Sequence, residues 1–453
     1  MLFSSIVFLF FFLPVVLTLY LLPSQRWRSF FFLLASFVFY AWSEGAYILV
    51  LLVSIFFNYL FGLWIGRPGG HDRTACGGIN ARKAVLVSGL NAPLGISFFT
   101  FHAISYLVDI YHGEGPVQKN PGALAIYFAA FPKVLAGPIA QYRQAYSELG
   151  RREITAAGLI YGIERFITGL AKKVLLANPL AAVADAAFGL QPENLVPYSA
   201  WAGILCYTLQ IYFDFSGYSD MAIGLGRMFG FEFPENFNFP YISQSVREFW
   251  HRWHISLSLW FRNYLYIPLG GNRRSRSWTL FNLAVVALVC GLWHGASWTF
   301  IIWGAWYGLF LVLERTWFGK LIERAPRVLR HIYLLAVVVI GWVFFRADST
   351  AFAITYLESM LGVHWGSVHT GQFSVHLNDE TFVLFAIAVF LCMPVSLLVK
   401  RLCAASPVGF ASSGGYRRTG FYVSYALFLG LVFFASIMAL AGGTHKAFIY
   451  FGF

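Results

Sequence analysis

Two histidines in apolar surroundings are the side chains of this sequence best suited to do chemistry. His294 lies between two apolar runs, in the segment Gly-Leu-Trp-His-Gly-Ala, and His254 lies in Trp-His-Arg-Trp-His-Ile-Ser-Leu-Ser. An ionisable side chain at membrane depth is costly, so by default it marks a functional site. Histidine titrates near neutral pH, which suits a general base acting on a hydroxyl group. The competing interpretation is that each histidine is a hydrogen-bonded core residue.

Metal chemistry fits the sequence less well. Two histidines are too few ligands, and no cluster of histidine, cysteine and carboxylate completes a set, so we expect no metal. The five cysteines form no close pair with metal-site spacing. Cys206, Cys290 and Cys392 lie in apolar runs, where cysteine is usually a small packing residue.

The densest polar sequence runs from Tyr212 to His254. It combines carboxylates, serines and tyrosines in an apolar setting, which indicates either a polar pocket or an internal hydrogen-bond network. Asp214 and Asp220 could instead only brace helices. The residues that we expect to bind substrate are Asp214, Ser216, Asp220, Asn236, Trp250 and Trp293.

A continuous helix is expected to carry His254. On such a helix Trp250, His254, Leu257 and Phe261 share one apolar stripe, while Glu248 pairs with Arg252 at i,i+4. His251 then lies nearer the charged side. Glu235–Tyr241, before this helix, is expected to be a loop because prolines flank and end it.

A basic segment follows. Arg262, Arg273 and Arg274 could bind the phosphates of a cytosolic cofactor. A loop that is basic only because it faces the cytoplasm explains them equally. The pair Gly270-Gly271 is too short to be a phosphate-binding fingerprint.

The composition decides the class of protein. Of 453 residues, 58% are hydrophobic and only 11% are charged, whereas a soluble domain carries about 25% charged residues. Many runs approach the roughly 20 apolar residues of a spanning helix. The sequence therefore predicts an all-α, polytopic integral membrane protein. The net charge of +12 lies in loops beside these runs, which argues against nucleic-acid binding.

We expect apolar spans over the following ranges: 3–22, 29–42, 46–65, 84–110, 123–140, 199–231, 278–294, 296–313, 332–345, 381–399 and 421–441. Residues 158–177 mix apolar and charged positions, which is typical of an interfacial or cavity-lining helix. Lysine and arginine are frequent in 315–330 and 400–418 and absent from 347–380. Residues 315–330 and 400–418 are therefore expected in the cytoplasm, and residues 347–380 outside it.

From the residues alone, a proton-coupled transporter and an acyltransferase both remain open. The motifs resemble those of the membrane-bound O-acyltransferase family, and most of all its bacterial branch of alginate acetylation and teichoic acid D-alanylation proteins. The resemblance rests on segments spread over nearly the whole chain: Phe3-Ser4-Ser5, Pro93–Phe98, Ala136–Ile139, Tyr212–Asp220, Glu235–Phe237, Glu248–Ser258, Leu269–Arg273, Gly291–Ala296 and the aromatic C-terminus.

The resemblance implies a ring of about ten or eleven transmembrane helices, with re-entrant or interfacial helices, around a thinned central core. It implies one domain over 1–453, with N-terminal helices in 1–140, a catalytic core in 199–314 and C-terminal helices in 331–453. His294 corresponds to the invariant histidine of the family, and His254 to its second polar catalytic position.

The resemblance further implies a bacterial inner-membrane protein that passes acetyl groups towards hydroxyls of an exported polysaccharide, such as alginate or cellulose. Cytosolic acetyl-CoA would be the donor, no cofactor would be permanently bound, and periplasmic acetyltransferase or acyl-carrier proteins would complete the transfer. Membrane lipid would surround the chain. Peptidoglycan acetylation, D-alanyl transfer and a polysaccharide or lipid transporter are the alternatives.

One stretch departs from the family pattern. A further apolar segment is expected between Lys83 and Pro93, where this chain has only Ala84 to Ala92. We expect either a shortened member or a break in the chain between Ala84 and Pro93.

Overall fold

The computed structural model describes residues 1–22, 24–66, 94–150, 152–363, 373, 377–395 and 415–443. Every regular element in these ranges is a helix, which confirms the all-α class. The departure expected at residues 84–93 lies outside the described residues, as do parts of the ranges 347–380 and 400–418 from which the topology is predicted.

Two compact units make up the described chain. One consists of Met1–Phe166 and Met221–Pro234, and the other of Ile167–Asp220 and Glu235–Phe453. The long helices α7 (Ala156–Ala171) and α9 (Pro197–Met228) contribute residues to both. The expected single domain over 1–453 stays a prediction.

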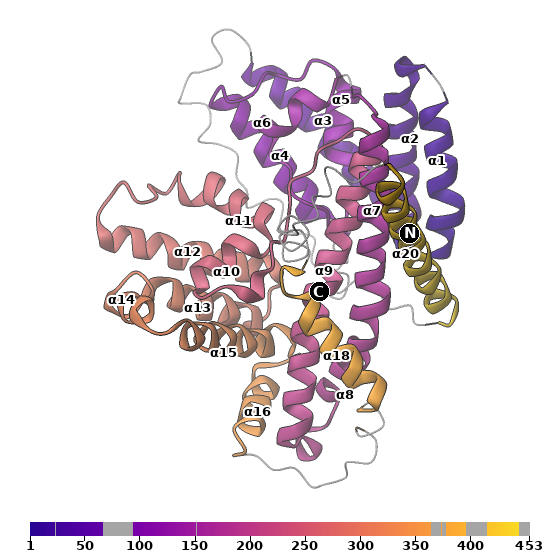
Figure 1. Ribbon diagram of the computed structural model, residues 1–453. Coiled ribbons are helices and arrows are strands. Elements are labelled where there is room, and N and C mark those ends of the chain that lie inside the picture. Colours follow the sequence, from indigo (N-terminus) through magenta and orange to yellow (C-terminus); the bar gives the residue numbers. More distant parts are fainter. Residues whose placement is uncertain are drawn as a thin grey trace. The chain divides into compact units, whose positions relative to one another are not determined.

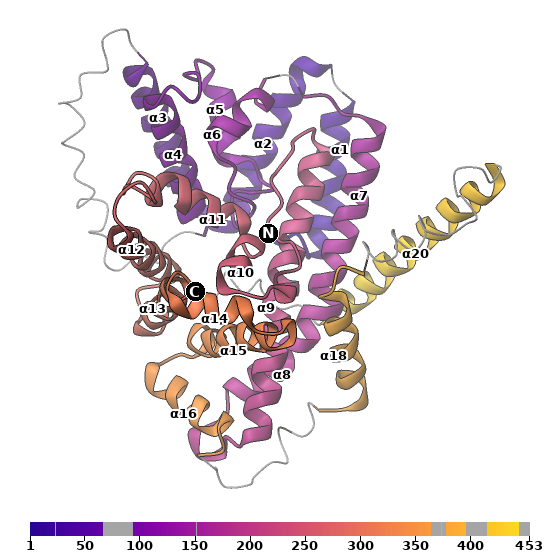
Figure 2. The same cartoon turned by 60° about the vertical axis from the view of Figure 1, so that its left-hand side comes forward.

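The first unit is built around phenylalanine rings. Those of Phe8, Phe39 and Phe131 lie between 5.6 and 6.4 Å apart, centroid to centroid. Helices α3 and α4 pack side by side, as Figure 2 shows, and α2 packs on α5. The helices of this unit besides α7 and α9 are η1 (Phe8–Phe12), α1 (Leu13–Leu21), α2 (Gln25–Glu44), η2 (Gly45–Tyr47), α3 (Ile48–Ile65), α4 (Ile96–Tyr111), α5 (Pro121–Ala129), α6 (Tyr142–Ala145) and η5 (Tyr146–Glu148).

The span expected at 123–140 is wrong. Helix α5 is only nine residues long, or about 13.5 Å at 1.5 Å per residue, against roughly 30 Å of hydrocarbon. The Asn120 side chain caps its start by accepting hydrogen bonds from the N–H groups of Gly122 and Ala123. Pro132 lacks the N–H that would continue the helix. Residues 130–141 are instead a buried run of turns and irregular chain.

The second unit holds a helical hairpin formed by α12 (Arg276–His294) and α13 (Trp298–Leu313), with α15 (Arg327–Arg346) packed against α13 (Figure 1). Glycine permits the close approach, since a Cβ on Gly291 would lie 2.4 Å from the Phe300 carbonyl oxygen, and one on Gly304 would lie 2.6 Å from that of Ala287. The other helices of this unit are η6 (Lys172–Ala177), α8 (Asn178–Phe188), η7 (Pro192–Asn194), η8 (Pro240–Ile242), α10 (Val246–Arg252), α11 (Ile255–Phe261), η9 (Arg262–Tyr266), α14 (Trp317–Arg324), α16 (Thr350–Met360), α18 (Asp379–Leu391) and α20 (Gly415–Ala441).

Several helices can cross a membrane by length and composition. Five helical stretches of the described chain qualify: Trp27–Ile65, Ala156–Phe188, Arg276–His294, Arg327–Arg346 and Tyr422–Ala441. Shorter apolar helices cover Phe8–Leu21, Ile96–Tyr111 and Trp298–Leu313. Large apolar side chains such as Leu427, Leu431 and Phe434 lie exposed on α20, as lipid-facing residues do. The chain is therefore a multi-pass membrane protein, and the count of ten or eleven spans stays a prediction.

Candidate functional site

His254 lies at a break between two short helices, so the continuous helix expected through this residue is wrong. Helix α10 ends at Arg252 and α11 begins at Ile255, and His254 between them has a φ of 44°. Backbone hydrogen bonds to the loop around Asn236 replace those that are missing where the helix breaks. The N–H of Ile255 donates to the Asn236 carbonyl (3.0 Å), and the N–H of Asn238 to the Arg252 carbonyl (2.9 Å). A tertiary contact has overridden the helical period.

The break buries His254 and leaves its neighbour His251 exposed. His254 has 1% of its surface exposed, and its ring packs edge-on against Phe215 at 4.7 Å. The expected contrast between the two histidines therefore holds, although its cause is the left-handed turn and not helical phase. The ion pair of Glu248 with Arg252 is confirmed at 3.0 Å.

Asn236 fixes the protonation of the buried His254 ring. Its Oδ1 accepts hydrogen bonds from the backbone N–H of Ser256 (3.2 Å) and from the Ser256 hydroxyl (2.9 Å). A backbone N–H can only donate, so the atom facing it must be the amide oxygen. The same oxygen lies 3.1 Å from Nδ1 of His254, which must therefore carry the proton.

The other ring nitrogen is left as a base. When neutral histidine is protonated on Nδ1, Nε2 keeps a free lone pair. The Nε2 atom of His254 is buried and finds no hydrogen-bond partner within the described ranges. Asn236 is itself held, because its Nδ2 donates to the Ser219 hydroxyl at 3.1 Å. The predicted loop at 235–241 thus supplies the residue that orients the histidine.

The carboxylates of α9 are ion-paired. Asp214 lies 2.7 Å from the ammonium of Lys173, and Asp220 lies 2.7 Å from that of Lys172. The Lys173–Asp214 pair is almost wholly buried, and this geometry corresponds to the interpretation in which the carboxylates brace helices. Ser216 is 1% exposed, and its hydroxyl has no partner among the residues that the structure covers. The sequence did not predict that these lysines pair with the carboxylates of α9, although both lysines interrupt an otherwise apolar helical pattern.

His294 ends α12 and is surrounded by aromatic rings. Its ring lies edge-on to Trp303 at 4.9 Å and to Phe345 at 5.0 Å, centroid to centroid. A Cβ on the following Gly295 would lie 2.5 Å from the Phe300 ring, so a larger residue there would displace the wall of this pocket. The side chain is thereby held in a narrow aromatic setting.

The structure brings the two predicted catalytic histidines together. The Trp293 ring lies 6.4 Å from that of His254 and 4.6 Å from that of His294. The histidines are also near enough for their charges to interact. His254 and His294, forty positions apart in the sequence (294 − 254), therefore belong to one site, in which the Trp293 ring lies near both.

A cavity of about 670 Å³ adjoins this site. Trp250 and Ile255, on either side of the His254 break, form part of its wall, together with the expected cofactor-binding residue Arg262. Three further arginines line the cavity, so its arginines outnumber its acidic residues. The charged lining residues are Arg247, Arg262, Arg315, Arg330, Glu248, Glu314 and Glu323. A basic, partly enclosed cavity of this kind suits a ligand that carries phosphates.

Two donors in this region are unsatisfied. The indole Nε1 of Trp250 and the Nε of Arg330 are buried without a hydrogen-bond partner among the described residues. Buried polar groups are normally paired, so these donors call for an acceptor from water or a ligand. Trp250 also packs edge-on against Trp303 at 5.7 Å. Trp250 thus lies between the cavity and the ring that contacts His294.

Glu314 positions the start of α10, and this role was missed in the sequence. Its carboxylate accepts hydrogen bonds from the N–H groups of Val246 (2.6 Å) and Arg247 (3.0 Å), and from the Tyr333 hydroxyl (3.2 Å). A carboxylate at a helix N-terminus satisfies free N–H groups and complements the helix dipole. The only signal in the sequence is an acidic residue that ends a long apolar run.

Arg273 and Arg274 lie away from the cavity wall. Both are exposed, and the Arg274 guanidinium lies over the Trp278 ring at 5.0 Å. Of the arginines expected to bind a cofactor, Arg262 therefore lines the cavity, whereas Arg273 and Arg274 do not.

The chain is similar in sequence to proteins of known family. A model described as "MBOAT, membrane-bound O-acyltransferase family" matches residues 119–355, which include both histidines and the cavity. The chain is 45% identical to a probable alginate O-acetylase of Pseudomonas aeruginosa, over 80% of this chain and 75% of the relative. It is 39% identical to the protein of that name from Azotobacter vinelandii, over 100% of both chains. It is 32% identical to a peptidoglycan O-acetyltransferase of Helicobacter pylori, over 89% of each.

Proposed function

Because this chain belongs to the membrane-bound O-acyltransferase family, we propose that it acetylates hydroxyl groups of an exported polysaccharide of the alginate type. The relatives with 39–45% identity carry the name alginate O-acetylase, and the peptidoglycan enzyme is more distant at 32%. The single observation that carries the mechanism is the pairing of His254, in one fixed tautomer, with His294 beside the Trp293 ring.

In the proposed reaction, His294 acts as the general base. It removes the proton from the acceptor hydroxyl as the oxygen attacks the acyl carbonyl carbon, and the bond to the leaving thiolate then breaks. His294 then passes the proton that it removed to the leaving thiolate. His254 positions the reacting groups, because Asn236 holds its Nδ1 and its unprotonated Nε2 can accept a hydrogen bond from a second hydroxyl of the acceptor.

Trp250 is the proposed donor to the acyl carbonyl. Negative charge develops on that oxygen during attack, and a fixed N–H aimed at it stabilises the transition state. The buried and unsatisfied Nε1 of Trp250, at the cavity wall, has the required chemistry. The acceptor side of the site is then shaped by Trp293, Ser216 and Asn236. The carboxylates of Asp214 and Asp220 act through the lysines with which they pair.

Acetyl-CoA is the proposed acyl donor. The arginine-lined cavity beside Trp250 supports this proposal, since guanidinium groups bind phosphates in bidentate fashion. Arg262, Arg247, Arg315 and Arg330 would hold the phosphates, while Arg273 and Arg274 would act only at the exposed edge. The proposed setting is a bacterial inner membrane, with periplasmic acetyltransferase or carrier proteins as partners.

Thiol release from acetyl-CoA by the purified protein in detergent tests the function. The account expects turnover that depends on His294, whereas a transporter or an assembly scaffold would release no thiol. The acyl acceptor is identified in cells, by comparing acetyl content in exported polysaccharide and in peptidoglycan with and without the protein. Acetylation found only in peptidoglycan would replace the polysaccharide proposal.

A further inference from the structure

A buried lysine in the first unit has no use in the reaction above. Lys133 is 2% exposed and lies in the buried run after α5. Its ammonium makes no hydrogen bond or ion pair with any residue that the structure describes. It lies over the faces of two aromatic rings, 4.4 Å from the centroid of Tyr127 and 5.9 Å from that of Phe233. Burying a charge without hydrogen-bonded partners is costly, so this side chain calls for water, a ligand or a neutral form.

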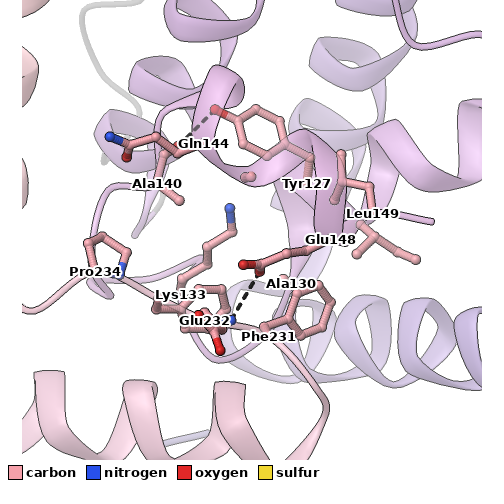
Figure 3. A pocket seen from close by; sticks show the side chains of 13 residues that line it. Tyr127, Ala130, Lys133, Ala140, Gln144, Glu148, Leu149, Phe231, Glu232 and Pro234 are labelled. Atoms are coloured by element: carbon pink, nitrogen blue, oxygen red, sulfur yellow. Dashed lines mark hydrogen bonds between the residues drawn. The ribbon is translucent and has the colours of Figure 1, made fainter. Parts of the chain in front are cut away.

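The Nζ atom of Lys133 points into a cavity. Figure 3 shows it in the space between Tyr127, Ala140 and Glu148. The cavity measures about 100 Å³, whereas a water occupies about 30 Å³ of liquid. It therefore has room for a few waters, or for a group the size of acetyl.

The walls of the cavity are mainly small or apolar. Ala130, Ala140, Ala145 and Leu149 are among the lining residues, and these side chains suit a methyl group. Its outer residues are polar, since Gln144 and Glu232 line the cavity and are both exposed. A small molecule can thus enter from the polar side and meet the amine at the inner end.

The charges around the cavity favour a neutral occupant. Glu148 lies beside Lys133, and its carboxylate accepts a hydrogen bond from the Glu232 N–H at 3.0 Å. An anion held inside the cavity would face the carboxylates of Glu148 and Glu232, and a cation would face Lys133, whereas an acyl donor places only its neutral acyl end beside the amine. A neutral group attached to the amine avoids both costs and removes the buried charge.

We propose that Lys133 is a site of covalent acylation, which takes a short acyl group from an activated donor of the acetyl thioester or acetyl phosphate class. The Nζ lone pair attacks the acyl carbonyl carbon and forms a C–N bond. The bond from that carbon to the thiolate or phosphate breaks, Glu148 takes the proton from nitrogen, and the leaving group receives it. The product is an amide, whose methyl group lies against the alanines. The inference rests on the proposed function only in assuming that an acetyl donor is present.

The environment of the amine supports nucleophilic attack. Burial lowers the pKa of Lys133 to about 7, against the opposing effect of the nearby Glu148 carboxylate. An ordinary lysine, with a pKa near 10.4, is neutral in only about one molecule in 2,500 at pH 7. At that pH Lys133 therefore presents a much larger fraction of the reactive, neutral form.

The test is acetylation of the purified full-length protein with acetyl phosphate or acetyl-CoA, followed by peptide mass spectrometry. Lys119 and Lys320, which are both exposed, serve as internal controls. At pH 7 Lys133 should react at least tenfold faster than either control with one or both donors, and the donor that labels it identifies the source. Its rate should level off above pH 8, while the rates of the controls continue to rise to pH 10.

Two results would overturn the proposal. One is labelling of Lys119 and Lys320 at pH 7 with Lys133 unmodified. The other is loss of Lys133 labelling in the His294→Ala protein, since that would mean that the acyl group arrives through the catalytic site. If labelling persists there while polysaccharide acetylation never occurs in cells, the proposed function fails and the lysine site stands.

Discussion

At the scale of single residues, one amide oxygen decides which nitrogen of His254 carries the proton. Asn236 receives a backbone N–H and a hydroxyl on the same oxygen that faces Nδ1. The histidines at 254 and 294 could be chosen from the sequence, because polar groups in apolar surroundings are rare, and Asn236 could be chosen as a polar residue in the loop before His254. The tautomer could not, because it depends on a contact between a loop and a helix break.

Asn236 should act through His254. We expect His254→Ala to lower acetyl transfer at least tenfold, and Asn236→Ala to lower kcat by a similar factor. The double variant should be little worse than either single one, because groups that act as a unit are not additive. His251→Ala, at an exposed residue on the cavity wall, should have a milder effect than His254→Ala. Additive losses in polymer acetyl content would show that Asn236 has a separate role.

Lys133 should make stability depend on pH. Burial lowers its pKa from 10.5 to about 7, so the unfolded chain binds a proton in this window that the folded chain lacks. Stability from this group therefore rises with pH, and the cost of burial is complete below pH 7 and gone above about 10.5. Lys133→Met should raise the melting temperature at pH 6, and this gain should disappear by pH 10. Lys119→Met is the matched control, and a lower melting temperature for Lys133→Met at pH 6 would contradict the account.

At the scale of elements, the sequence predicted helices better than their breaks. The apolar runs at 278–294 and 296–313 became α12 and α13. The continuous helix through His254 and the span at 123–140 both failed, because periodicity carries no information about the loop at 236–238 or about the turns after Ala129. The sites of chemistry in this chain lie at such irregular places.

The α12–α13 hairpin should tolerate no side chain at its contact. In Gly291→Ala the new Cβ would meet the Phe300 carbonyl oxygen at 2.4 Å, so the helices must separate and His294 must move. We expect at least a tenfold loss of acetyl transfer and a lower melting temperature. Gly430→Ala on α20, where nothing lies within 4 Å, should change neither. Equal behaviour of the two variants would argue against close packing as the reason for Gly291.

At the scale of the whole molecule, loop charge gives the orientation. The basic loops at 315–330 and 400–418 are expected in the cytoplasm and the acidic 347–380 outside it. In a cysteine-free background, a cysteine at Ser367 should react with an impermeant reagent from the periplasmic side, and one at Ser413 should not. The reverse labelling pattern would invert the predicted topology and, with it, the side of the membrane on which the arginine-lined cavity is expected.

The central claim is that His294 transfers acetyl groups in the membrane, and the acetyl content of the exported polysaccharide tests it most directly. Cells that carry the wild type, His294→Ala or the exposed control His112→Ala should contain equal amounts of the protein in their membranes. The account predicts acetylated polymer with the wild type and His112→Ala, and none with His294→Ala. A wild-type acetyl content in the His294→Ala cells would contradict it.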